Sequence, residues 1–183
     1  EDIESGGESR ALFYARTLDN WSGDPVVSEE AIESASASLS QKMKDDIQFS
    51  HDRVRKFAEA QLNSLTEFEV ELSPGLVAGQ KLIPIGTAGC YIPGGRYAHI
   101  ASAIMSVTTA KVAGVDNITA CSPARAAEGI HPSIIYAAHL AGVDTLLSLG
   151  GVQGVAALAF GLFSGHSADI LVGPGNRYVA EAK

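Results

Sequence analysis

Glycine-rich stretches are the parts of this chain whose residue types and spacing best suit ligand binding. They are Pro93-Gly94-Gly95, Gly150-Gly151-Val152-Gln153 and Gly173-Pro174-Gly175-Asn176. Glycine lets a backbone approach a ligand closely, and the start of a following helix offers free N–H groups to an anion such as a pyrophosphate. The G-x-G-x-x-G fingerprint is absent, so a dinucleotide would be bound by an irregular variant. The alternative is that these stretches are only tight turns.

Short apolar segments that read as β-strands precede these stretches. Strands are expected over residues 89–93, 117–122, 145–149 and 169–172, and helices over residues 102–112, 132–140 and 153–163. The phrase Ala-Gly-Val-Asp occurs twice, 28 residues apart, which is the size of one βα unit. Apolar strands that alternate with helices predict an α/β fold, with a parallel sheet covered by helices on both faces. The carboxyl ends of its strands share one edge, where ligands bind.

The first half of the chain differs in charge from the second. Residues 1–88 carry 16 acidic and 8 basic side chains, whereas residues 89–183 carry 5 of each. The first half is predicted to hold a helix over 9–18, a helix that begins at an N-cap Ser28, a helix over 41–62, and strands over 68–72 and 79–85. We therefore predict a mostly helical part (1–88) that precedes an incomplete Rossmann-like sheet (89–183). Because predicted helices reach both ends, the chain is expected to be truncated at each.

Composition excludes several classes of protein. The chain has 183 residues, a net charge of −8 and a pI near 5.0, which is unfavourable for nucleic-acid binding. No apolar run is long enough to span a membrane, and no signal peptide is visible. The two cysteines, Cys90 and Cys121, cannot staple a fold of this size. We expect them to be reduced, buried and inert thiols rather than nucleophiles, and the protein to be cytoplasmic.

At residues 89–95 the chain resembles the histidinol dehydrogenase family, whose pattern here is a Gly-x-Tyr-x-Pro-Gly-Gly turn. The resemblance continues through residues 131–144, 149–161 and 173–183, and upstream through residues 53–61 and 74–80. It therefore extends over roughly the whole chain. It implies the N-terminal and NAD-binding part of a zinc-dependent, NAD-linked homodimeric enzyme. Such enzymes oxidise an alcohol to an aldehyde and then to a carboxylate.

The resemblance places Tyr91, Gln153 and Asn176 on NAD-contacting positions. The ring of Tyr91, at a strand end, could pack against the nucleotide while its hydroxyl hydrogen-bonds. The amide of Gln153 can both donate and accept, and Asn176 could hold a ribose or a phosphate. The structural alternatives are that Tyr91 is a core aromatic residue and that Gln153 and Asn176 are helix caps.

No catalytic or metal-binding residue is expected within the chain itself. The resemblance assigns the zinc ligands and the acid/base pair to positions beyond Lys183, and none of the five histidines matches those positions. His131 and His139 are expected to lie on one helix and to cover a surface. No cluster of His, Cys, Asp or Glu shows the spacing of a zinc site.

One segment departs from the family pattern. Arg96 and His99 lie where typical histidinol dehydrogenases carry a stretch with Pro and Ser or Thr, and the segment looks more like the branch that oxidises sulfonated diols such as sulfopropanediol. Two basic side chains beside the predicted cofactor turn would suit an anionic substrate group. The alternative is that both face solvent.

Two functions follow as hypotheses. The first is NAD-dependent, zinc-requiring oxidation of a small-molecule alcohol, either histidinol or a sulfonated diol, by a homodimer. The second is a non-catalytic module that binds a nucleotide or a partner chain, which is suggested by the missing metal and acid/base residues. A purely structural subunit ranks last.

Overall fold

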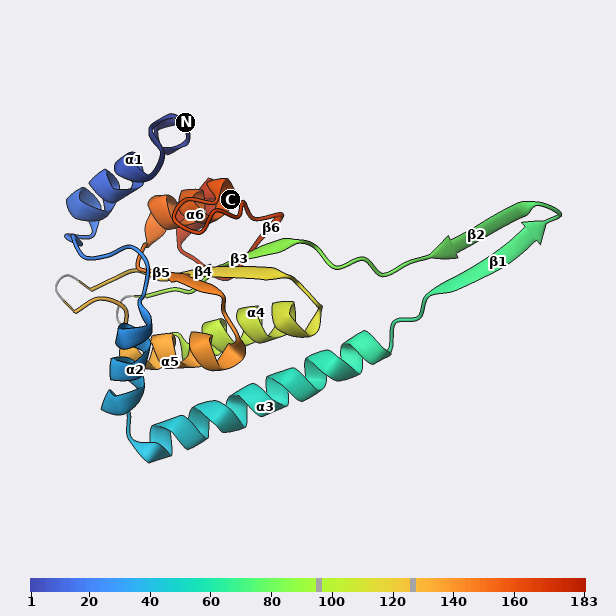
Figure 1. Ribbon diagram of the computed structural model, residues 1–183, viewed down its shortest axis with the longest axis horizontal. Coiled ribbons are helices and arrows are strands. Elements are labelled where there is room, and N and C mark those ends of the chain that lie inside the picture. The colour runs from blue at the N-terminus through green and yellow to red at the C-terminus, as the bar shows by residue number, and fades with distance from the viewer. Residues whose placement is uncertain (95–96, 126–127) are drawn as a thin grey trace.

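A parallel four-stranded sheet forms the centre of the protein, seen in a computed structural model that describes residues 1–94, 97–125 and 128–183. Its strands lie in the order β5-β4-β3-β6, and every neighbouring pair is parallel (Figure 1). The strands are β3 (Thr87–Tyr91), β4 (Asn117–Cys121), β5 (Thr145–Leu147) and β6 (Ile170–Val172). The predicted α/β fold with a parallel sheet is therefore confirmed.

Helices cover both faces of this sheet. Helices α4 (Ile100–Val112) and α5 (Pro132–Ala141) lie on one face, and α6 (Gly151–Phe160) and α7 (Arg177–Ala182) lie on the other (Figure 1). Each predicted helix of this half exists, although α6 ends at Phe160, earlier than expected, with Gly161 as its C-cap. No helix of the described ranges is both long and apolar enough to span a membrane.

The alternation of side chains along β3 divides the core into two layers. Ala88 and Cys90 point into the core beneath α4 and α5, whereas Tyr91 belongs to the core on the α6 side. Side chains of successive strand residues point to opposite faces, so this division follows directly from the strand conformation. It places the aromatic ring that ends β3 on the same face as α6.

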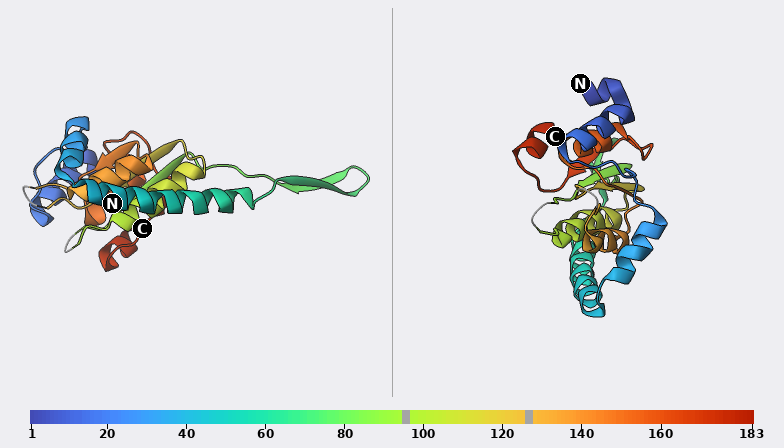
Figure 2. Two further views of the ribbon diagram at one scale, coloured as in Figure 1. Left: turned by 90° about the horizontal axis from the view of Figure 1, so that it is seen from below. Right: turned by 90° about the vertical axis from the view of Figure 1, so that its left-hand side faces the viewer.

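The N-terminal helices extend both layers. Helix α1 (Asp2–Leu18) packs on α6, α2 (Glu29–Ser38) packs on α5, and α3 (Gln41–Asn63) packs on α4 (Figures 1 and 2). Helix α2 begins as predicted at Ser28, whose Oγ accepts a hydrogen bond from the Ala31 amide at 3.2 Å. The division of the chain at residues 88 and 89 stays a prediction. Strand β3 begins at Thr87, just before that division.

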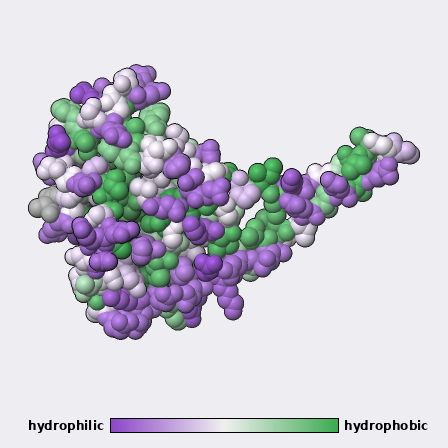
Figure 3. All heavy atoms as spheres, in the orientation of Figure 1, coloured by the Kyte–Doolittle hydropathy of each residue, from purple (hydrophilic) through white to green (hydrophobic). Residues whose placement is uncertain are grey.

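A β-hairpin projects away from the rest of the molecule (Figures 1 and 2). It consists of β1 (Phe68–Ser73) and β2 (Leu76–Gln80), which are antiparallel and exposed along their whole length. The strand predicted over 79–85 is therefore wrong. Pairing of Phe68 with Gln80 ends the hairpin, and residues 81–86 belong to no strand. Figure 3 shows apolar side chains on this hairpin and along the neighbouring part of the molecule.

Gly173 is the position at which a side chain would disturb the sheet most directly. It follows β6 with a φ of +117°, and a Cβ there would overlap the carbonyl oxygen of Tyr91. We expect Gly173→Ala to lower the free energy of unfolding by about 3 kcal/mol, because backbone strain and a clash add together. Gly165→Ala is the control, since φ is +75° but no atom lies within 4 Å; it should cost about 1 kcal/mol. Urea denaturation measures the free energy of unfolding of both variants. Equal losses in the two would contradict the predicted clash at Gly173.

Candidate cofactor site

A cleft of about 730 Å³ opens at the carboxyl edge of the sheet. It is called the carboxyl-edge cleft below. Its lining comes from the end of α1, the end of β3, the start of α6 and the loop that precedes α7, and it includes all three residues predicted to contact NAD, Tyr91, Gln153 and Asn176. The structure thus brings together side chains that are up to 85 positions apart in the sequence.

Tyr91 joins the end of β3 to the start of α6. Its side chain is buried, and its hydroxyl oxygen accepts a hydrogen bond from the Gly151 amide at 3.1 Å. Burial raises the pKa of Tyr91 to about 12, so the hydroxyl keeps its proton at neutral pH and can donate it to a ligand. The residue is therefore a core aromatic, as the alternative held, and also part of the cleft wall.

Gln153 is not a helix cap. The residue that caps α6 is Gly150, and Gln153 lies three positions later, with 2% of its surface exposed. Its Nε2 donates a hydrogen bond to Oδ2 of Asp19 at 2.7 Å. This bond fixes the orientation of the amide and leaves Oε1 as its free acceptor, with no partner in the described part of the chain.

Asn176 is the N-cap of α7, as the structural alternative held. Its Oδ1 accepts hydrogen bonds from the amides of Tyr178 and Val179 at 3.0 and 3.2 Å. Because the oxygen is used in this way, the Nδ2 group remains available as a donor. Capping and lining the cleft are compatible roles here.

Asp19 is a candidate site residue that the sequence did not reveal. It is the C-cap of α1 and lines the carboxyl-edge cleft beside Gln153. Burial raises the pKa of its carboxyl above the usual value, and the hydrogen bond from Gln153 opposes this in part. The two partners are 134 residues apart, so no local pattern signals the contact.

Of the two basic residues predicted to lie beside the cofactor turn, the structure places one at the cleft. His99 lines the cleft, immediately before α4, whereas Arg96 lies outside the described residues.

His131 is the N-cap of α5, where its Nδ1 accepts a hydrogen bond from the Ser133 amide. His131 therefore precedes the helix that carries His139 instead of lying on it, because an imidazole nitrogen can cap a helix as a side-chain oxygen does. Both side chains are at least partly exposed, as predicted.

The described residues offer neither an accessible thiol nor a cluster of metal-binding side chains. Cys90 and Cys121 are fully buried, as predicted, and burial raises the pKa of both thiols, that of Cys90 to about 11. Residues 1–94, 97–125 and 128–183 contain no group of three His, Cys, Asp or Glu side chains that could hold a metal ion.

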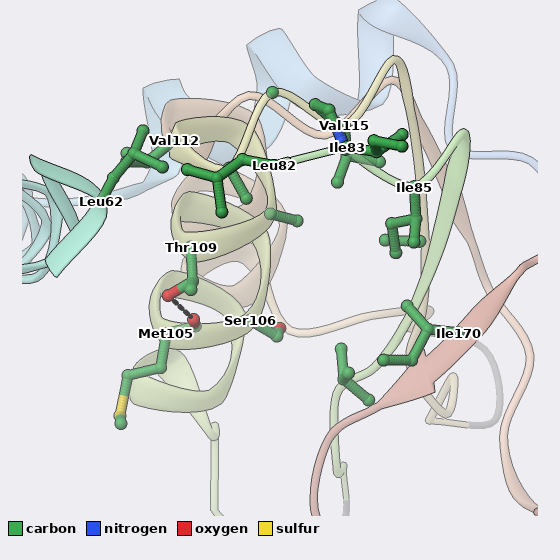
Figure 4. A pocket seen from close by; sticks show the side chains of 16 residues that line it. Leu62, Leu82, Ile83, Ile85, Met105, Ser106, Thr109, Val112, Val115 and Ile170 are labelled. Carbon is green, nitrogen blue, oxygen red and sulfur yellow. Dashed lines mark hydrogen bonds between the residues drawn. The ribbon is translucent and has the colours of Figure 1, made fainter. Parts of the chain in front are cut away.

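A second hollow, of about 640 Å³, lies between α4 and the segment that links the hairpin to β3 (Figure 4). Its lining is apolar apart from two hydroxyls. Those of Ser106 and Thr109 donate to the carbonyl oxygens of Ser102 and Met105 within α4. With its hydroxyls occupied in this way, the hollow offers little to orient a polar ligand, and the carboxyl-edge cleft is the better candidate site.

Comparison with known proteins identifies the family. The sequence model described as histidinol dehydrogenase matches residues 1–183. The chain belongs to the histidinol dehydrogenase family. Sulfopropanediol 3-dehydrogenase of Ruegeria pomeroyi is 58% identical over 182 residues, which cover 100% of this chain and 42% of that protein. Histidinol dehydrogenase of Methanosarcina barkeri is 37% identical over 183 residues, with 100% and 42% covered.

A solved structure of the family has the same fold. The crystal structure of histidinol dehydrogenase from Elizabethkingia anophelis aligns with a TM-score of 0.92 at 32% identity, and covers 100% of this chain and 42% of that one. The chain thus spans about two fifths of the length of the family members that it matches.

The partial burial of Asp19 makes the free energy of unfolding depend on pH. Since the folded pKa is raised, the folded chain holds the carboxyl proton more tightly than the unfolded chain. Ionisation therefore destabilises the fold progressively as pH rises through the ordinary carboxyl range, and fully above the raised pKa. We expect Asp19→Asn to raise the free energy of unfolding slightly at pH 7, since solvent screens a half-exposed carboxylate, and by less as pH falls toward 4.

Urea denaturation at several pH values measures this difference. Asp116→Asn, at an exposed position outside the cleft, is the matched control and should show no such gain at pH 7. A loss of stability in Asp19→Asn at pH 7 would contradict the expected sign of the effect.

Proposed function

We propose that the carboxyl-edge cleft binds NAD, and that the chain is the cofactor-binding part of an alcohol dehydrogenase. One observation carries the proposal: Tyr91, Gln153 and Asn176 line one cleft at the carboxyl edge of a parallel sheet. Ligands bind at this edge in open α/β sheets, and the volume of about 730 Å³ falls within the usual range of ligand sites.

The lining of the cleft fits a dinucleotide in its donors and acceptors. The Tyr91 hydroxyl and the Asn176 Nδ2 group can donate hydrogen bonds, whereas Gln153 Oε1 and the Asp19 carboxylate can accept them. The absence of a side chain at Gly150 matters as well. A Cβ there would lie 2.7 Å from the ring of Pro123, so glycine lets the turns after β4 and β5 pack together under the cleft.

When bound, NAD supplies an acceptor for the hydride that an alcohol loses on oxidation. The residues of this chain would bind and orient it. Tyr91 holds the first turn of α6 against β3, and Asn176 holds the first turn of α7, so both sides of the cleft are set before a ligand arrives. Such preorganisation reduces the entropy lost on binding.

The substrate that we propose is a small alcohol, oxidised through an aldehyde to a carboxylate. A sulfonated diol is supported over histidinol by two observations. The sulfopropanediol 3-dehydrogenase relative is 58% identical and the histidinol dehydrogenase relative from M. barkeri is 37% identical. His99 also lines the cleft, and its imidazole could donate a hydrogen bond to an anionic group.

The residues described do not fit zinc, because they form no group of three metal-binding side chains. The zinc requirement stays a prediction from the family resemblance. The homodimer stays a prediction too. It is supported by the exposed apolar side chains of the β1–β2 hairpin, which an interface would bury.

NAD binding tests the proposal directly. We expect calorimetry to show NAD binding to the 183-residue chain, and Tyr91→Phe to weaken it about two- to tenfold, the usual effect of one hydrogen bond. The same substitution leaves the Gly151 amide without its acceptor, so the free energy of unfolding should fall by about 1 kcal/mol. Tyr136→Phe on α5, outside the cleft, is the control. Binding that Tyr91→Phe and Asn176→Ala both leave unchanged would place NAD elsewhere.

Turnover separates the enzyme from the second candidate, a non-catalytic nucleotide-binding module, which the missing metal-binding group favours. With NAD, zinc and 2,3-dihydroxypropane-1-sulfonate, a protein that contains this chain and has the length of its dehydrogenase relatives should produce NADH, which absorbance detects. We expect NADH to form faster with this diol than with histidinol. NAD binding without NADH from either alcohol would instead support the module for this chain.

A further inference from the structure

Asp19 occupies an electrostatically poor position on the wall of the carboxyl-edge cleft. Its carboxylate lies at the C-terminal end of α1, where the helix dipole is negative. In the part of the chain that the structure describes, it forms no ion pair, and its only side-chain hydrogen bond comes from the neutral amide of Gln153. The carboxylate is half-buried and faces the cleft, so a ligand that brings hydrogen-bond donors could bind it in place of water.

The hydrogen bond between these two residues creates a pair of adjacent acceptors. Because Gln153 Nε2 donates to Asp19 Oδ2 at 2.7 Å, the second carboxylate oxygen of Asp19 and Oε1 of Gln153 remain without donors among the described residues. Both residues line the cleft. A ligand that meets this pair must bring two hydrogen-bond donors on neighbouring atoms.

A vicinal diol of a ribose has this arrangement. Each hydroxyl can donate to one acceptor, and the bond to the carboxylate is strengthened by its charge. A phosphate in place of one hydroxyl would lack the donor and would be repelled by Asp19. In many nucleotide-binding sheets an acidic residue at the end of the next strand performs this role. Here the next strand, β4, ends in Cys121-Ser122-Pro123, which has no carboxylate.

We propose that Asp19, held beside Gln153, binds the vicinal diol of the adenosine ribose and excludes a 2′-phosphate, so that the cleft selects NAD over NADP. This inference rests on the proposed NAD site. Asp19 comes from the helix before the sheet rather than from the sheet itself, so the acidic N-terminal half supplies the residue that determines cofactor specificity.

The test is calorimetric titration of the 183-residue chain with NAD and, separately, with NADP. The wild-type chain should bind NADP at least about tenfold more weakly than NAD. Asp19→Asn should weaken NAD about tenfold and leave NADP unchanged or tighter, so that the preference disappears. Asp19→Glu keeps the charge and should retain a preference for NAD. If the Asn variant does not fold, Asp19→Ser carries the same expectation.

Two further variants distinguish selection of NAD over NADP by the Asp19 charge from a general disturbance of the cleft. Gln153→Ala should weaken NAD but preserve the preference over NADP, because the Asp19 charge remains. Asp116→Asn, exposed and outside the cleft, should change neither. A wild-type chain that binds neither dinucleotide overturns the proposed function and this inference with it. A chain that binds NAD with a preference that neutralising Asp19 leaves intact, or with no preference, overturns the inference alone.

Discussion

The hydrogen bond from the Gly151 amide to the Tyr91 hydroxyl is the interaction on which the site depends. It ties the end of a central strand to the first turn of α6, in a partly buried position where loss of the acceptor would cost about 1 kcal/mol. The alternation of side chains along β3 makes this bond possible, since it directs the Tyr91 ring toward the α6 layer. The geometry of the cleft is therefore a consequence of how the core is divided into two layers.

Much of this arrangement could be predicted from the sequence. The strands of the sheet are short apolar segments bounded by Gly, Pro or Asp, and the helices between them are almost wholly apolar, so their order and type were readable. Parallel connection then requires the strand ends to meet at one edge, and Tyr91, Gln153 and Asn176 do meet there. These features depend on local patterns and on one general rule of chain topology.

What could not be predicted depends on contacts between distant segments. Nothing near Asp19 in the sequence distinguishes it from other acidic residues of the first half, because its partner Gln153 is 134 residues away. The end of the β1–β2 hairpin could not be predicted for a similar reason. Alternation predicted β1 well, but the end of β2 is determined by the register with β1 and not by the apolar residues that follow Gln80.

The contact between Asp19 and Gln153 also changes how the two halves of the chain relate. The two halves differ strongly in charge, and every site residue predicted from the sequence lies in the second half. In the structure α1 packs on α6, and its last residue forms part of the cleft wall. The carboxylate is partly buried, and its hydrogen bond from Gln153 offsets only part of the cost of that burial, so a ligand in the cleft accounts for its presence better than folding does. With NAD bound in the cleft as proposed, the acidic half is part of the binding site as well as of the fold.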